Sequence, residues 1–133
     1  MNSSITDKKS QVTRDYFEKL KVWQKSHELV LEVYETIDSF PKSERFGLID
    51  QIKRAVTSIP NNIAEGTGRN TSKELLRFLY VARGSLEEIK YLLILSRDLG
   101  YIEEDLYSNL KKDANIVGKL LNGFINSVKK DNE

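Results

Sequence analysis

Four segments of this 133-residue sequence repeat apolar residues at alternating intervals of three and four positions. This spacing places the apolar side chains of a helix on one stripe, so each segment predicts an amphipathic α-helix. We expect these helices over about 15–39, 44–65, 71–99 and 103–128. The predicted stripe of the first consists of Leu20, Trp23, His27, Val30, Tyr34 and Ile37, and that of the second of Ile49, Ile52, Val56, Ile59 and Ile63. The third stripe consists of Leu75, Leu79, Ala82, Leu86, Ile89, Leu93 and Ser96, and the fourth of Leu106, Leu110, Ala114, Val117, Leu121, Phe124 and Val128. Seven glycines and two prolines are too few for a turn-rich β-fold. The sequence therefore predicts an all-α protein.

Residues near the segment ends carry the usual signals that start and stop helices. Pro41 ends the first segment, because the residue before a proline avoids helical backbone. Ser43 is expected to cap the second helix. Thr71 and Glu74 form a capping-box sequence at the start of the third, and Gly100 is expected to end it.

Short connections between these segments predict that consecutive helices are antiparallel. The expected fold is an antiparallel up-down-up-down four-helix bundle over residues 14–128. The polar segment 1–13 and the last residues, 129–133, are expected to be disordered tails.

A proline lies inside the second apolar segment and has a predicted structural effect. Pro60 has no N–H group to donate to the carbonyl of Val56, so we expect a kink there. Asn62 and Glu65 follow, and we expect them to satisfy backbone groups near the kink. Gly66 is expected to end this helix. The alternative reading of Asn62 and Glu65 is a polar feature at one end of an assembly.

The sequence lacks the residue sets that most enzymes use. It contains no cysteine and one histidine, which excludes disulfides, thiolate metal sites and zinc sites with several histidines. The pair His27–Glu28 begins like a zinc-protease motif, but Leu31 stands where the second histidine is needed. No set of residues supplies a nucleophile, a base and oxyanion donors together. We expect no enzymatic activity, no cofactor and no metal site.

Neither a secretory signal nor a membrane span is recognisable in the sequence. Residues 1–13 have no apolar core, and no stretch approaches the roughly 18 apolar residues that a span requires. With the absence of cysteine, these features favour a cytoplasmic protein without membrane association.

Charge is nearly balanced in total but not along the chain. Lysine and arginine number 21 against 20 aspartates and glutamates, yet residues 45–97 contain nine basic and five acidic side chains. A phosphate-binding face is the hypothesis for the basic residues of this region. Its candidate members are Arg45, Lys53, Arg54, Arg69, Lys73, Arg77 and Arg83. The alternative is a set of solvated or ion-paired surface charges.

The third apolar segment carries more apolar residues than a single bundle needs. Five of them run consecutively from Tyr91 to Leu95 and would surround a helix. We therefore predict self-association, with Gly84 allowing close backbone approach. The candidate interface residues are Tyr80, Gly84, Tyr91, Ile94 and Leu95. The alternatives are that the first and fourth helices cover these residues, and that Gly84 serves a contact within one bundle.

The run from Gln51 to Gly66, QIKRAVTSIPNNIAEG, resembles the signature of the 23S rRNA intervening-sequence protein family. Segments 20–29, 77–88 and 99–101 resemble the same family, and the similarity covers about residues 16–128. The resemblance implies a four-helix bundle that assembles as a homopentamer and has no catalytic activity. Relatives of the family serve as accessory proteins to the reverse transcriptases of diversity-generating retroelements.

Two functional hypotheses follow from these observations. The first is a non-enzymatic, pentameric bundle whose basic surface binds RNA or another nucleic acid with low sequence specificity. The second is a protein-interaction scaffold that docks a partner such as a reverse transcriptase. Salt separates them, because phosphate contacts release counterions and weaken steeply as salt rises.

Overall fold

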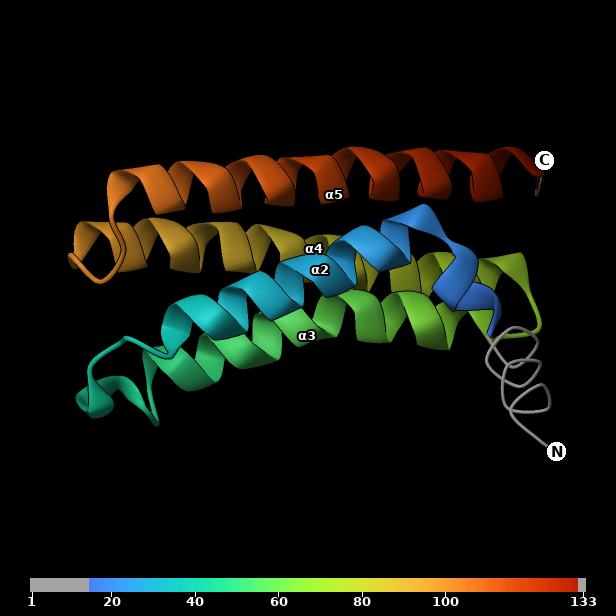
Figure 1. Cartoon of the computed structure of the whole chain (residues 1–133). Helices are drawn as coiled ribbons and strands as arrows, with labels where there is room; N and C mark the ends of the chain where they lie inside the picture. The colour runs from blue at the N-terminus through green and yellow to red at the C-terminus, as the bar shows by residue number, and fades with distance from the viewer. Residues whose placement is uncertain (1–14, 132–133) are drawn as a thin grey trace, which may run out of the picture.

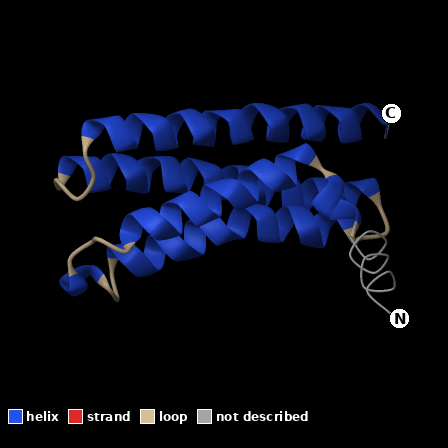
Figure 2. Ribbon diagram, viewed as in Figure 1, coloured by secondary structure: helices blue, strands red, loops and turns tan. Residues whose placement is uncertain are grey.

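The computed structural model describes residues 15–131, and all of the regular structure in that range is helical (Figure 2). The four long helices and two short 3-10 helices are η1 (Tyr16–Lys19), α2 (Lys21–Ile37), η2 (Lys42–Glu44), α3 (Leu48–Thr67), α4 (Ser72–Asp98) and α5 (Glu104–Asp131). The all-α prediction is confirmed. The expected N-terminal tail, 1–13, lies outside the described residues.

The four long helices form a closed ring of neighbours (Figure 1). Each contacts the next along the chain, and α2 contacts α5, whereas the diagonal pairs are not in backbone contact within residues 15–131. The α2–α3 and α4–α5 connections lie at one end of the bundle and the α3–α4 turn at the other. This arrangement is the predicted up-down-up-down four-helix bundle.

One polar contact joins the two connections at the same end. The Tyr101 hydroxyl donates a hydrogen bond to a carboxylate oxygen of Glu44 over 2.8 Å. The ring of Tyr101 also lies 5.2 Å from that of Phe40, centre to centre. The loops that the bundle brings together are therefore held to each other as well as to their own helices.

Aliphatic side chains from all four helices fill the core. The most completely buried are Leu29, Ile52, Ile59, Ile63, Leu79, Ile89, Leu93, Leu110, Leu121 and Ile125. The predicted stripe of the third segment is confirmed in α4, where only Leu75 among its members is half-buried. The last helix buries Tyr107 and Ile125, whereas the predicted Leu106 is exposed and Phe124 half-buried.

The predicted stripe of the first segment is correct in part. The expected Val30 and Ile37 are buried in α2, but the expected His27 and Tyr34 are exposed, and Leu29 and Val33 are buried in addition. Buried hydroxyls explain the difference, since Ser26 and Thr36 also face the core. Ser26 donates to the carbonyl of Trp23 over 2.9 Å and Thr36 to that of Glu32 over 2.8 Å. A hydroxyl satisfied by its own helix is buried at little cost.

Helix ends agree with the sequence where a side chain or a glycine determines them. Thr71 caps α4, because its hydroxyl accepts the Glu74 N–H over 3.1 Å. Gly100 has a φ of 80°, and the next N–H, of Tyr101, donates to the carbonyl of Ser96 over 2.9 Å. This bond closes a Schellman motif that ends α4.

Three predicted boundaries are wrong. The first segment begins as η1, and extended backbone at Leu20 separates it from α2. Ser43 lies inside η2 and caps nothing, and the second long helix begins at Leu48 after Gly47. The expected C-terminal tail is helical as far as Asp131, because α5 continues through Lys129 and Lys130.

Helix α3 continues through Pro60 to Thr67 instead of ending at Gly66. The Asn62 amide donates to the Ser58 carbonyl over 2.7 Å and to its hydroxyl over 2.9 Å, which is the local role expected of it. Ser58 also accepts the Ser85 hydroxyl over 2.7 Å and so joins α3 to α4. Glu65, in contrast, pairs with Arg69 over 3.7 Å.

Gly66 marks a close approach of α3 to α4. A Cβ atom there would lie 2.9 Å from Leu75 Cδ1 and 3.0 Å from Phe78 Cβ. We therefore predict that Gly66→Ala lowers the free energy of unfolding by about 1–3 kcal/mol, the usual cost of overpacking. Urea denaturation measures this change.

Gly123 on α5 provides the matched control, because a Cβ atom there meets nothing within 4 Å. Gly123→Ala should leave stability unchanged or raise it by up to about 1 kcal/mol, since alanine favours helix. Equal effects of the two substitutions would contradict the close approach.

Candidate functional site

The seven basic residues singled out in the sequence are exposed but do not form one face. Arg45 and Lys53 line a groove between α2 and α3, together with Lys42 and Tyr34. The Lys53 ammonium lies 5.4 Å from the centre of the Tyr34 ring, a cation–π contact. These residues form the first basic region.

The second region lies around the α3–α4 turn and includes Arg69, Lys73 and Arg77. Arg69 has structural contacts of its own, because it pairs with Glu65 and its guanidinium lies 4.7 Å from the Phe78 ring centre. Glu65 and Lys53 are twelve residues apart on α3, or about 18 Å along its axis. The first two regions therefore lie well apart.

The remaining two residues lie on different sides of α4. Arg54 borders a groove between α3 and α4 that Glu88 also lines. Arg83 faces α5, where its guanidinium donates to the Asn122 side-chain oxygen over 3.2 Å. It also lies 5.1 Å from the ring centre of Tyr80. A single phosphate-binding face made of all seven residues is thus not what the fold assembles.

A basic surface that the sequence analysis missed lies on α5. We call it the α5 lysine groove, and it is lined by Ser108, Lys111, Lys112, Asn115, Ile116 and Lys119. No carboxylate lines this groove. Lys112 and Lys119 are seven residues apart and share one helix face. The signal was present in the sequence, because residues 108–130 contain five lysines and one acid, Asp113.

A smaller cavity opens beside that groove, between α4 and α5. This α4–α5 pocket has a volume of about 170 Å³ and is lined by Lys90, Leu93, Ile94, Tyr107, Lys111 and Asn115. Lys111 and Asn115 also line the α5 lysine groove, so the two hollows are neighbours.

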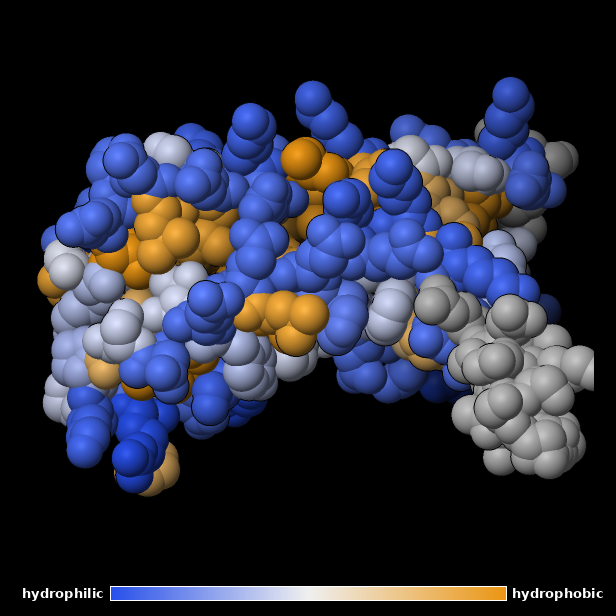
Figure 3. Space-filling view, viewed as in Figure 1, coloured by the Kyte–Doolittle hydropathy of each residue, from blue (hydrophilic) through white to orange (hydrophobic). Residues whose placement is uncertain are grey.

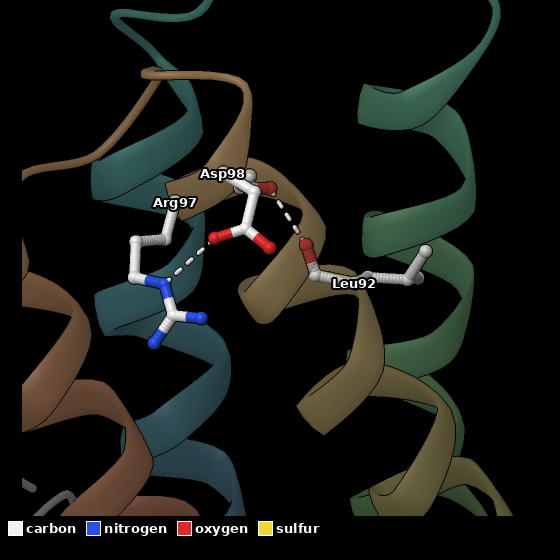
Figure 4. A network of polar contacts seen from close by, with 4 residues as sticks. Leu92, Arg97 and Asp98 are labelled. Atoms are coloured by element: carbon white, nitrogen blue, oxygen red, sulfur yellow. Dashed lines mark hydrogen bonds and ion pairs between the residues drawn. The ribbon is translucent and has the colours of Figure 1, made fainter.

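Further cations lie around this pocket. The Arg97 guanidinium lies 4.4 Å from the Tyr107 ring centre. Its Nε donates to the side chain of Asp98 over 3.0 Å at the end of α4 (Figure 4). The Lys90 ammonium pairs with Glu87 over 3.3 Å. These contacts hold two cationic side chains beside the pocket.

The opposite side of α5 is acidic. A groove between α2 and α5 is lined by Glu32, Glu35 and two leucines, Leu106 and Leu110. Figure 3 shows apolar surface between these helices, surrounded by hydrophilic side chains. Burial raises the pKa of Glu32 to about 7, assisted by a hydrogen bond with Asp113 and by the charges of Asp113, Glu28 and Glu35.

The predicted interface residues divide into two groups. Tyr80 and Tyr91 are 40% and 58% exposed, and a Cβ atom at Gly84 would meet nothing within 4 Å. These three residues recur at four and seven positions and so share one outward strip of α4. Ile94 instead borders the α4–α5 pocket, and Leu95 is half-buried against the core.

Within residues 15–131 no three histidine, cysteine or acidic side chains are grouped so that they could hold a metal ion. None of the helices described is long and apolar enough to cross a membrane. The fold and surface define an all-α bundle whose candidate binding residues lie on helix faces.

Comparison with known proteins places this bundle in a family. Residues 18–123 match the 23S rRNA-intervening sequence protein family. The chain belongs to that family, as its resemblance in sequence indicated. No curated protein matches the chain significantly.

A solved structure supports the same placement. The chain is similar to a protein of unknown function from the S23 ribosomal protein family of Bacteroides thetaiotaomicron VPI-5482, with a TM-score of 0.72 and 27% sequence identity. The match covers 79% of this chain and 95% of the other.

The raised pKa of Glu32 predicts how stability depends on pH. The pKa of about 7 in the folded state exceeds the ordinary value of 4.5, so folding favours the protonated carboxyl. The contribution to stability is complete below about pH 4.5 and is lost as the pH rises to about 7. Glu32→Gln should remove this dependence and stabilise the protein at pH 8.

Thermal unfolding between pH 4.5 and 8 measures the effect. The control Glu103→Gln alters an exposed carboxylate before α5 and should keep the pH profile of the unaltered protein. A Glu32→Gln profile identical to that of the control would show that Glu32 does not cause the dependence.

Proposed function

We propose that this protein is a non-enzymatic homo-oligomer that binds RNA with low sequence specificity. The observation that carries the proposal is the α5 lysine groove, where Lys111, Lys112 and Lys119 line one hollow without any carboxylate. An unopposed row of ammonium groups is the chemistry that binds a polyphosphate backbone.

The composition of the groove also accounts for low sequence specificity. Lysine acts as a flexible point charge and does not offer the planar fork with which arginine reads guanine. Ser108 and Asn115 add neutral hydrogen-bonding groups along the same hollow. These side chains suit phosphate and sugar contacts, which position a nucleic acid without reading its bases.

The exposed residues Arg45, Lys53, Arg54, Lys73 and Arg77 remain candidates for secondary phosphate contacts. Among the described residues none of them forms an ion pair. Since they lie in separate regions, they would act by widening the positive surface around an RNA that the groove holds.

We propose further that the outward strip of α4 forms the contact between subunits. Its aromatic members, Tyr80 and Tyr91, are the kind of exposed apolar side chain that interfaces bury. Gly84, between them, leaves bare helix backbone that a second helix can approach. The family resemblance favours five subunits in the assembly.

A scaffold function is the alternative, and one observation favours it. The acidic groove between α2 and α5 combines Glu32 and Glu35 with the apolar Leu106 and Leu110. Such a surface suits a basic protein partner, for instance a reverse transcriptase, and binding there would depend on salt less steeply than RNA binding does.

Fluorescence anisotropy with a structured RNA tests the RNA proposal. We predict submicromolar binding at about 50 mM salt that weakens by an order of magnitude or more at 200 mM. Lys112→Glu combined with Lys119→Glu should weaken binding at least tenfold and flatten the salt dependence.

The control for this experiment carries the same charge change elsewhere. Lys21→Glu and Lys25→Glu on α2 should leave RNA affinity within about threefold, because both lie on a different helix from the groove. Absence of binding at 50 mM salt would reject the RNA proposal and favour the scaffold.

A substitution of Gly84 tests the assembly, because it should stabilise the helix and weaken the contact between subunits. Gly84→Gln should favour the helix by up to about 1 kcal/mol within one chain, yet its side chain should separate the subunits. We predict a smaller assembly by analytical ultracentrifugation, with helicity retained by circular dichroism.

Gly123→Gln, at the other glycine with open space around its Cβ position, should leave the assembly intact. If Gly84→Gln also leaves it intact, the subunit contact lies elsewhere.

A further inference from the structure

We propose that the α4–α5 pocket receives the pyrimidine base of an unpaired nucleotide whose phosphates lie along the α5 lysine groove. The inference rests on the proposed RNA binding and adds the class of RNA: single-stranded, with a pyrimidine nucleotide at this site. Its basis is that an apolar cavity and a lysine row share Lys111 and Asn115.

The floor of the pocket suits the faces of a flat ring. Leu93 and Tyr107 are buried beneath it, and Ile94, 36% exposed, stands at the edge. The Tyr107 ring is fixed by Arg97, 4.4 Å from its centre. Contacts between bases and apolar or aromatic side chains are the usual means by which proteins hold unpaired nucleotides.

The volume of the pocket restricts which base fits. Its 170 Å³ slightly exceeds the cavity of about 150 Å³ that accommodates benzene in an engineered protein core. A single six-membered ring therefore fills it, and the second ring of a purine finds no room. This argues for a pyrimidine.

The polar rim offers hydrogen-bonding partners to the edge of a pyrimidine. Lys90 and Lys111 offer ammonium groups, which only donate hydrogen bonds, and Asn115 offers both a donor and an acceptor. Lys90 uses one of its three protons for Glu87, 3.3 Å away, and keeps two. Uracil presents two carbonyl acceptors and one N–H donor, and cytosine presents a carbonyl acceptor, a ring-nitrogen acceptor and one amine donor. Either pyrimidine therefore matches two ammonium donors and one amide oxygen.

The groove then supplies the backbone contacts on either side of the base. Lys111 stands at the junction of pocket and groove, and Lys119 follows eight residues later, about 12 Å along α5. A base held in the pocket is thus continuous with a strand whose phosphates pass the lysine row. A duplex keeps its bases stacked and presents none to the pocket.

The test compares four labelled RNAs of about eight nucleotides, within the site sizes of single-strand-binding proteins, using the full chain in its native assembly. They are oligouridine, oligoadenosine, an abasic backbone of the same length, and a duplex. We expect oligouridine to bind about tenfold more tightly than the other three, the usual gain from one well-seated base.

Ile94→Phe should place an aromatic ring in the pocket and remove this preference, leaving the affinity for the abasic backbone unchanged. Leu99→Phe is the matched control, because Leu99 is exposed at the end of α4 and does not line the pocket. It should keep the full preference for uridine.

A second measurement does not depend on any substitution in the protein. Oligouridine carrying one 5-iodouracil should photocrosslink to Tyr107, as identified by mass spectrometry. Crosslinks only to other residues would overturn the proposal.

The outcomes separate the inference from the function on which it rests. Equal, salt-sensitive binding of all four RNAs would overturn the pyrimidine pocket and leave the RNA-binding function standing. Loss of binding to all four RNAs at low salt would reject both.

Discussion

The close packing of α3 against α4 is the contact on which the surface of this molecule depends. Gly66 lets the two helices approach near their turn, and the Ser58–Ser85 hydrogen bond joins them further along. A polar pair within a mainly apolar interface fixes the register of the helices, because a shift would leave hydroxyls without partners. With that register fixed, α4 turns Tyr80 and Tyr91 outward and directs Ile94 toward α5.

The division of charge on α5 follows from helix geometry in the same way. Lys112 and Asp113 are neighbours in sequence, yet about 100° of rotation separates their side chains. Lys112 lines the lysine groove, while Asp113 hydrogen bonds with Glu32 of α2. The chain as a whole carries a net charge of only +1, but the two sides of one helix differ strongly in sign. Net charge therefore says little about what this surface attracts.

The sequence predicts features that depend on nearby residues better than features that depend on tertiary contacts. Thr71 and Gly100 mark helix ends by chemistry that acts within a few residues, and both predictions were correct. The stripe of α2 was predicted only in part, because Ser26 and Thr36 are polar residues that lie buried. Their hydroxyls are satisfied by their own helix, and no hydropathy pattern shows this.

The basic residues followed the same division. Arg45 to Arg83 formed a cluster along the sequence, but four helices placed its members on separate surfaces. The lysines of α5 lie outside the basic stretch 45–97, although their helical spacing puts Lys112 and Lys119 on one face. The lysine cluster becomes visible when basic residues are grouped by helix face and not by position along the sequence.

In the proposed assembly, several copies of the α5 lysine groove could bind one RNA at the same time. A few lysine–phosphate contacts bind weakly at physiological salt, since each exchanges with counterions. Several identical grooves on one assembly would raise the local concentration of sites, so an RNA long enough to reach two grooves binds far more tightly than either groove alone. The proposed strip on α4 and the proposed groove on α5 share no residue, so one assembly could use the strip for subunit contacts and repeat the groove for phosphate contacts.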